Sequence, residues 1–277
     1  MSHELLRLTG ELYDVPHLVS LDGFNRVINY LELRNAGLAS MPTHKQEPVK
    51  KEFYDTKTKV ATISLMGTTT YRHSEMNALC GLTSYEGILA QTQEAIDAGV
   101  KKIVLHIDSG GGSAQGCFAS ANEFRQMCDA AGVTVYGFVD GSCCSAALAW
   151  GVVCDVLVAD QYSNIGSLGV LVALKDTSEA DAKEGVKTIY ITDGASKVPF
   201  DENGKYKSEF LKELQDKVTY LGDEFRKHVS MYTGIPVDKL KDTQAKVYMA
   251  NDAMNIGFIN KIMTKTEFVS YVMNGEM

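Results

Sequence analysis

The sequence contains no run of eighteen apolar residues, no basic stretch and no secretion signal. Without such an apolar run, no segment is expected to span a membrane. A net charge of −8 without a basic run argues against a general nucleic-acid-binding protein. The first residues, MSHELLRLTGELYD, are polar and of mixed charge, unlike a secretory signal peptide. These absences predict a cytoplasmic protein that binds neither membrane nor nucleic acid.

Paired metal-binding and phosphate-binding motifs are also missing. The 277 residues include six cysteines, two of them adjacent at Cys143 and Cys144, which is not the pattern of a disulfide framework. The cysteines also lack the paired CxxC spacing of zinc sites. No glycine-rich segment continues into Gly-Lys-Ser/Thr or has the spacing of a dinucleotide-binding motif. We therefore expect buried free thiols, no metal and no cofactor.

Apolar strand patterns alternate with helical patterns through most of the chain. The expected strands are 60–65, 102–107, 133–139, 153–159, 188–192 and 258–263. The expected helices are 83–98, 113–131, 178–184, 207–232 and 251–255. This alternation predicts an α/β fold with a mainly parallel sheet and flanking helices.

The first part of the chain differs from the rest in composition. A helical pattern runs from Phe24 to Leu33, and a charged segment with Pro42 and Pro48 follows it. We interpret residues 1–58 as an N-terminal helical arm with a charged linker and residues 59–277 as one domain. The arm can pack on its own domain or on a partner subunit.

Three segments rich in small residues each follow an expected strand: 109–112, 141–147 and 166–169. Sites in α/β sheets form beyond the carboxyl ends of the strands, so these segments can converge. Ser145 lies near the start of a helix expected from Gly141, where backbone N–H groups and the helix dipole favour a serine nucleophile and its oxyanion. The alternative is a small-residue helix that only packs closely. The glycines likewise serve either a strand-to-helix turn or an oxyanion.

A serine nucleophile needs a base, and no histidine is well placed, since His106 lies within a strand. A neutral lysine can take this role in Ser-Lys acyl transfer, provided that burial or dipoles favour the neutral form. The candidate is Lys197, which follows an expected strand, although a loop lysine is ordinarily a solvated surface residue. Cys144 is the alternative nucleophile.

Four motifs in order, IDSGGGS, CSAALAWGVVCD, NIGSLGV and DGASKVPF, resemble the signal peptide peptidase A (protease IV) family. The chain is more closely similar to the head maturation, or capsid assembly, proteases of lambda-like phages. That likeness extends from PHLVSLDGFNRV near the start to VYMANDAMNIGFINKI near the end. The resemblance implies a ClpP/crotonase-like fold and a serine peptidase with a Ser-Lys dyad.

The resemblance also implies a role for individual residues. Ser145 matches the nucleophile, Lys197 the general base, and Ser167 the hydroxyl that orients the lysine. In the family, the serine and the lysine of one site can come from adjacent protomers of a ring or dome. The chain is therefore expected to be a homo-oligomer with shared sites.

The oxyanion hole follows from the same resemblance. Gly111 and Gly112 match the family's Pro-Gly-Gly element, and the N–H of Ala146 is the expected second donor. Gly110 stands where the family has proline, which should loosen this loop.

The function implied is that of an endopeptidase cleaving scaffold, capsid or portal proteins during phage head maturation. It would work in the cytoplasm of the bacterial host and inside the procapsid. Because the chain stops at Met277, soon after the last motif, the scaffold is expected to be a separate protein or a longer product of the same gene. One alternative is a non-catalytic capsid or scaffold-interaction protein on the same fold. A crotonase-type acyl-CoA enzyme is another, but it needs site carboxylates and an adenine pocket.

Overall fold

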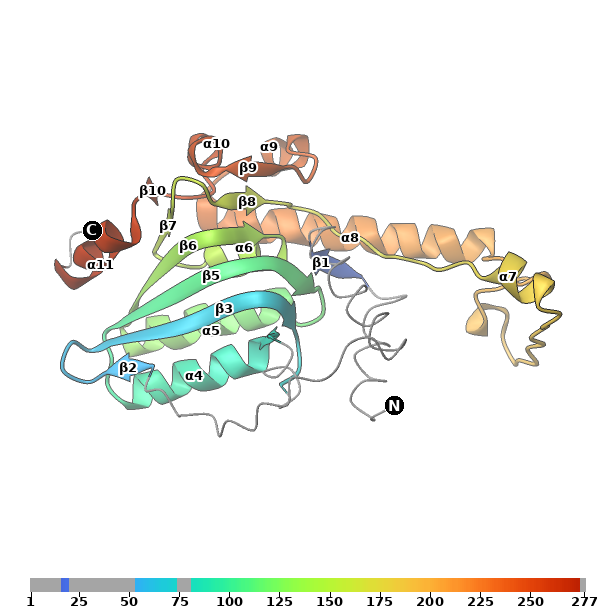
Figure 1. Cartoon of the computed structure of the whole chain (residues 1–277), viewed down its shortest axis with the longest axis horizontal. Helices are drawn as coiled ribbons and strands as arrows, with labels where there is room; N and C mark the ends of the chain where they lie inside the picture. The colour runs from blue at the N-terminus through green and yellow to red at the C-terminus, as the bar shows by residue number, and fades with distance from the viewer. Residues whose placement is uncertain (1–15, 20–52, 74–80, 275–277) are drawn as a thin grey trace.

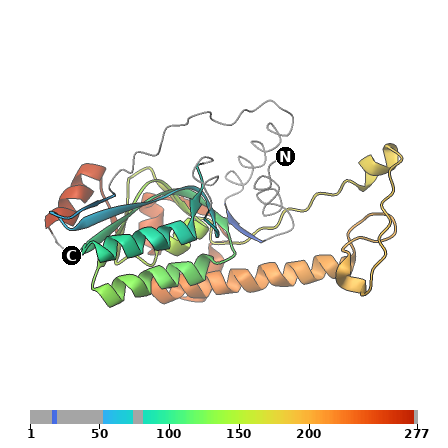
Figure 2. The same cartoon turned by 90° about the horizontal axis from the view of Figure 1, so that it is seen from below.

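The computed structural model describes residues 16–19, 53–73 and 81–274, which form one mixed sheet with flanking helices (Figures 1 and 2). The strands are β1 (His17–Val19), β2 (Tyr54–Asp55), β3 (Val60–Thr70), β4 (Thr83–Ser84), β5 (Lys102–Ser113), β6 (Thr134–Cys144), β7 (Val156–Ala159), β8 (Asn164–Gly166), β9 (Val247–Met249) and β10 (Lys261–Ile262). The helices are α4 (Tyr85–Asp97), α5 (Cys117–Ala131), α6 (Ala146–Gly151), α7 (Ser178–Lys183), the 3-10 helix η1 (Ala195–Lys197), α8 (Ser208–Thr233), α9 (Val237–Asp242), α10 (Ala250–Ile256) and α11 (Lys265–Asn274).

The centre of the sheet is parallel. Its strand order is β10-β7-β6-β5-β3-β2, and every neighbouring pair in this series is parallel except β2 with β3 at the edge. Further antiparallel pairs come from β1, which joins β5, and β9, which joins β8. The predicted α/β class with a mainly parallel sheet is confirmed.

Helices cover the two faces of the sheet unequally. On one face α4 and α5 pack side by side, with α6 against β5 and part of α8 against α6 (Figure 2). The opposite face carries α11 near β6, where the rings of Phe138 and Phe268 stack with centroids 4.6 Å apart. Residues of β3 accordingly alternate, with Ile63 buried and Ser64 exposed, as a half-covered sheet requires.

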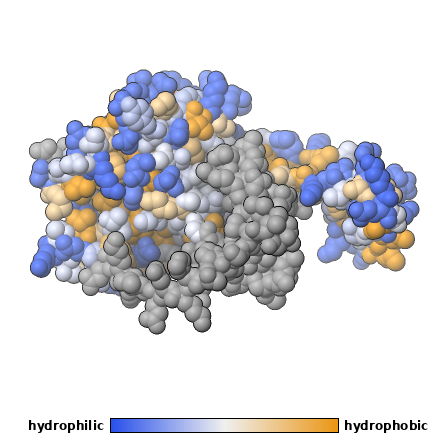
Figure 3. Space-filling view, in the orientation of Figure 1, coloured by the Kyte–Doolittle hydropathy of each residue, from blue (hydrophilic) through white to orange (hydrophobic). Residues whose placement is uncertain are grey.

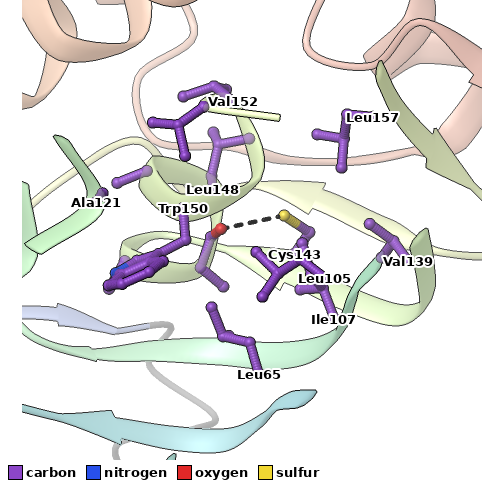
Figure 4. Packing of buried hydrophobic residues seen from close by; sticks show 14 of the residues in the cluster. Leu65, Leu105, Ile107, Ala121, Val139, Cys143, Leu148, Trp150, Val152 and Leu157 are labelled. Atoms are coloured by element: carbon purple, nitrogen blue, oxygen red, sulfur yellow. Dashed lines mark hydrogen bonds between the residues drawn. The ribbon is translucent and has the colours of Figure 1, made fainter. Parts of the chain in front are cut away.

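Every residue of the short helix α6 is buried. Trp150 is fully buried and stacks on Tyr85 with ring centroids 5.5 Å apart. Figure 4 shows this helix against the strands, where the Cys143 thiol donates a hydrogen bond to the Ala147 carbonyl at 3.4 Å. A methyl group at Gly151 would lie 2.9 Å from the Cys143 sulfur. Small residues therefore allow α6 to approach the sheet closely, as expected.

Residues 172–207 leave the body of the molecule, and we call them the extension. They contain α7 and η1, and the chain returns along α8, whose 26 residues span about 39 Å (Figure 1). The predicted helices 178–184 and 207–232 are confirmed by α7 and α8. The predicted strand 188–192 is wrong, because this segment lies exposed with no strand beside it to complete its hydrogen bonds.

Two pieces of the predicted N-terminal arm fall within the described residues. They form β1 and β2, which pair with β5 and β3. The helical pattern from Phe24 to Leu33 lies outside the described residues. Across the described part of the chain, no helix is long and apolar enough to cross a membrane.

Candidate active site

Ser145 is the single residue between strand β6 and helix α6. Its backbone has φ 57° and ψ −119°, a conformation that side-chain-bearing residues rarely adopt. The helix expected from Gly141 begins instead at Ala146, because residues 142–144 continue β6 and pair with β8. A strained residue in a sharp turn from strand to helix is a common setting for a nucleophile.

The surroundings of Ser145 fix its backbone but hold its hydroxyl loosely. Its N–H donates to the Gly166 carbonyl at 2.8 Å, and its own carbonyl accepts from the N–H of Leu148 at 2.9 Å. The hydroxyl donates to the Gly169 carbonyl at 3.4 Å, which is long for an O–H···O bond. The residue is fully buried. The hydroxyl is therefore held in position without a strong hydrogen bond.

The glycine segment 109–112 brings the backbone of β5 against Ser145. These residues extend β5, so the strand-to-helix turn considered for them is wrong: Ser109 pairs with β6, and Gly111 and Gly112 pair with β3 and β1. Gly111 has φ 98°, and a methyl group there would overlap the Leu18 carbonyl and lie 2.9 Å from Ser145 Cβ. Only glycine fits such a position.

The predicted oxyanion donors sit beside the nucleophile. The N–H of Gly111 donates to Ser109 Oγ at 3.1 Å, so Gly111 must release this contact before it can bind an oxyanion. Gly112 follows it, and a methyl group there would overlap the backbone of Thr69. Ala146 is the first residue of α6, and its N–H has no acceptor within that helix. The oxyanion hole of Gly111, Gly112 and Ala146 stays a prediction.

The turn that contains Ser167 lies directly against Ser145. Ser167 has φ 54°, and its N–H donates to the Lys246 carbonyl at 2.9 Å. Gly166 and Gly169 on either side of it accept the two hydrogen bonds of Ser145. The three small-residue segments thus converge, as the sequence predicted.

Lys197 is the last residue of η1, in the exposed extension. Its backbone N–H donates to the Gly194 carbonyl at 3.2 Å. The Lys207 ammonium ties η1 to the start of α8 through the carbonyls of Ala195 at 3.0 Å and Val198 at 2.9 Å. The candidate base is therefore anchored at the outer end of the long helix.

The nucleophile lies beside the other half of α8. His228 Nε2 lies 2.9 Å from the Ala149 carbonyl of α6. Twenty-one residues of helix separate Lys207 from His228, which corresponds to roughly 30 Å. Within one chain the structure therefore keeps Lys197 apart from Ser145, in contrast to the converging turns.

The alternative groups at the site are poorly suited to catalysis. Burial raises the pKa of the Cys144 thiol to about 12, so the thiol is protonated at neutral pH and a weak nucleophile. His106 contacts Asp140 at 2.8 Å and the ring of Phe138, as a packed strand residue would. The five cysteines within the described residues are free thiols, four of them buried. In the same residues, no three His, Cys, Asp or Glu side chains are grouped to hold a metal ion.

Asp155, at the end of the Ser145 motif, has a structural role. Its carboxylate accepts hydrogen bonds from the Val135 N–H at 2.7 Å and from Arg125 at 3.0 Å. These bonds join the segment after α6 to β6 and α5, and so fix the far end of the helix that Ser145 begins.

One element beside Ser145, strand β1, is not predicted by any pattern in the sequence. It pairs with Gly111, Gly112 and Ser113 of β5 in antiparallel orientation. A strand of three residues is too short to show a periodic pattern. The only local signal is Pro16 before it, since proline often precedes or begins a strand.

A sequence model for peptidase family S49 matches residues 129–276, a stretch that includes Ser145, Ser167 and Lys197. The chain is 29% identical over 212 residues to the head-tail preconnector protein GP5 of Enterobacteria phage P21, covering 76% of this chain and 42% of that protein. It is 27% identical over 224 residues to the capsid assembly protease C of Escherichia phage lambda, covering 80% and 51%. The chain thus spans about half the length of these curated relatives.

Solved structures of peptidases are similar at much lower identity. A ClpP1 mutant from Listeria monocytogenes is 12% identical with a TM-score of 0.47, covering 76% of this chain and 95% of that one. A peptidase from Plasmodium falciparum is 13% identical with a TM-score of 0.45, covering 76% and 98%. Because the family model matches more than half of the chain, the chain belongs to peptidase family S49.

Proposed function

We propose that this protein is a serine endopeptidase in which Ser145 of one copy works with Lys197 of a second copy. The observation that carries the proposal is the strained, buried position of Ser145 between β6 and α6, beside the glycines of β5. A hydroxyl held this way, with backbone N–H groups nearby, suits attack on a peptide carbonyl.

The surface of the extension supports a site shared between copies. None of residues 172–207, all of which the structure describes, is buried, yet the segment carries large apolar side chains (Figure 3). Ile191 is 96% exposed and Ile189 76% exposed, with Val186 and Tyr190 beside them. Apolar groups clustered on a projecting segment are typical of a protein–protein contact. A second copy that covers them would bring Lys197 to a neighbouring Ser145 and exclude water from it.

The proposed reaction needs only these groups. Neutral Lys197 accepts the proton of Ser145 as Oγ bonds to the scissile carbonyl carbon, and the backbone N–H groups of Gly111 and Ala146 stabilise the oxyanion. Lys197 then gives this proton to the leaving amine as the peptide bond breaks. Water hydrolyses the acyl-enzyme in the same way, with Ser167 holding the lysine in orientation. We expect cleavage to be insensitive to metal chelators, because the proposed reaction uses no metal ion.

The proposed substrates are proteins of a phage procapsid: scaffold, capsid or portal proteins. The relatives named for head-tail connection and capsid assembly support this assignment. The enzyme would then act inside the procapsid, in the cytoplasm of the bacterial host.

Co-expression with the scaffold and major capsid proteins of the same phage tests the proposal. Ser145→Ala and Lys197→Ala should each leave the scaffold intact on a gel, whereas the wild type cleaves it. Lys187→Ala is the matched control, because Lys187 is an exposed lysine of the same extension and should not affect cleavage. Identical behaviour of all four proteins would contradict the dyad and favour a non-catalytic capsid protein.

A further inference from the structure

Strand β1 pairs with the end of β5 (Figure 1), makes a bridge to Leu171 on its other side, and lies close to Ser145. From this placement we infer that β1 occupies the groove in which a peptide substrate binds, so that the chain holds one of its own segments in the substrate position. The assignment of this groove to a substrate rests on the proposed function. The evidence that the groove binds a strand comes from the backbone contacts of β1 alone.

The backbone of β1 is paired on both sides. Leu18 and Val19 pair with Gly112 and Gly111 of β5 in antiparallel register. On the other side, the His17 N–H donates to the carbonyl of Leu171 at 2.8 Å and the Leu171 N–H donates back at 2.9 Å. The three-residue strand β1 thus pairs with the end of β5 on one side and is joined to Leu171 by two hydrogen bonds on the other.

The turn at Ser145 leaves the edge of β5 without a partner strand, and β1 pairs with this edge. Strand β6 pairs with β5 only as far as Cys143 opposite Ser109. Beyond that point β6 turns into α6, and the edge of β5 is left for another strand. An unpaired strand edge binds an extended peptide through main-chain hydrogen bonds. The fold therefore creates a peptide-binding edge at the same place where it presents its nucleophile.

The distance from β1 to the nucleophile is short. A methyl group at Gly111 would touch three neighbours at once: the Leu18 carbonyl, the Cys144 carbonyl at 2.9 Å and Ser145 Cβ at 2.9 Å. The main chain of β1 and the side chain of Ser145 therefore meet across a single glycine. A peptide that replaced β1 would run its carbonyl groups past the hydroxyl.

The groove also has a side-chain preference. Leu18 is fully buried and belongs to the main hydrophobic core, and its neighbours His17 and Val19 are nearly so. Neighbouring side chains of a strand point to opposite faces, so Leu18 alone fills the core-facing position. A substrate segment bound in this groove would be extended, with an apolar residue in the position of Leu18.

Competition between β1 and substrate follows from this arrangement. A segment tethered in the same chain acts at an effective concentration on the order of millimolar. Substrate binding then requires β1 to leave, and any change that fixes β1 in place should block it.

A reversible disulfide tests the inference in the full chain. In the variant His17→Cys with Leu171→Cys, the new cysteines form a hydrogen-bonded antiparallel pair, whose Cα atoms lie about 5.5 Å apart and suit a disulfide. A second lock, His17→Cys with Ser113→Cys, ties β1 to β5 on its other side. Each single variant is the control, since it cannot form the lock.

Peptide binding is measured in the Ser145→Ala background, where no cleavage can occur. The probe is a fluorescein-labelled peptide with the sequence of residues 14–22, DVPHLVSLD, followed by anisotropy. Reduction of either lock with dithiothreitol should strengthen peptide binding at least tenfold, and the single variants should not respond. Equal binding in the oxidised and reduced forms, including none in either, would overturn the inference. The reduced lock is also tested for scaffold cleavage in a chain that keeps Ser145. If peptide binding depends on reduction but this chain does not cleave the scaffold, only the proposed function is contradicted.

Discussion

The two halves of the proposed site lie in regions of opposite character. Ser145 is fully buried in the body, where three backbone segments meet around it. Lys197 lies in the extension, whose Ile191 is 96% exposed. Packing within one chain determines the position of the nucleophile, whereas none of residues 172–207 around the proposed base is buried. The proposed sharing of the site between copies would account for this difference, because one chain then builds only the half that contains Ser145.

Helix α8 shows the same contrast within one element. Phe225, His228 and Val229 are buried in its C-terminal half. In its N-terminal half no side chain is buried, and Leu214 and Val218, which continue the apolar stripe, are only half-buried. An apolar stripe that continues past the body implies a partner for the outer half.

Truncation of the central aromatic residue should have the largest effect on stability. Trp150→Ala removes a fully buried ring stacked on Tyr85 and should lower the free energy of unfolding by about 3–5 kcal/mol. Tyr190→Ala in the extension should change it by less than about 0.5 kcal/mol. Urea unfolding of both variants measures the difference, and equal losses would mean that the extension packs as tightly as the body.

Two glycines with nearly the same backbone angle provide a matched pair. Gly111 has φ 98° and Gly194 has φ 102°, but a methyl group at Gly111 would collide with Leu18 and Ser145, whereas at Gly194 nothing lies within 4 Å. Gly111→Ala should cost about 3 kcal/mol of unfolding free energy, from overlap added to backbone strain. Gly194→Ala has the strain alone and should cost about 1 kcal/mol. If the two costs are the same, the crowding around Ser145 is not as described.

An exposed apolar residue of the extension should affect assembly without affecting the fold. Ile191→Ser should leave urea unfolding of the single chain unchanged and raise the dissociation constant between copies about tenfold. Sedimentation velocity across a concentration series measures this shift. Unchanged association would mean that Ile191 does not contribute to the contact between copies.

The smallest expected effect concerns pH and the buried half of α8. Burial lowers the pKa of His228, which packs between Phe118 and Tyr232, because the folded state disfavours the charged ring. The unfolded chain binds the proton more readily, so stability is full above the unfolded pKa of about 6.5 and falls as the pH drops below it. The urea midpoint of the wild type should fall between pH 7 and 5 by more than that of His228→Gln. An identical fall would assign the effect to other groups.

The sequence predicted the body of the fold better than the extension, for a physical reason. Apolar strands such as 102–107 depend on burial that is common to all parallel sheets. The apolar residues 188–192 have the pattern of a strand, but a strand needs a neighbour, and the described residues of one chain offer none there.

The candidate site was predicted unevenly for a similar reason. Small residues around Ser145 indicated close backbone approach, and the structure brings Gly111 and Ser167 to it. The separation of Lys197 from Ser145 depends on the path of the chain through α8, which no local pattern contains. Strand β1 was missed because a segment of three residues can be recognised as a strand only from its pairing with β5.

Mixing two inactive variants tests the central claim most directly. Ser145→Ala retains Lys197, and Lys197→Ala retains Ser145, so a site shared between copies can be rebuilt from the two. Co-expression of both with the scaffold protein should restore cleavage to about a quarter of the wild-type rate, since random assembly gives one intact site in four. If the mixture stays as inactive as either variant alone while the two chains still associate, both groups must come from the same chain, and the account of a shared site is wrong.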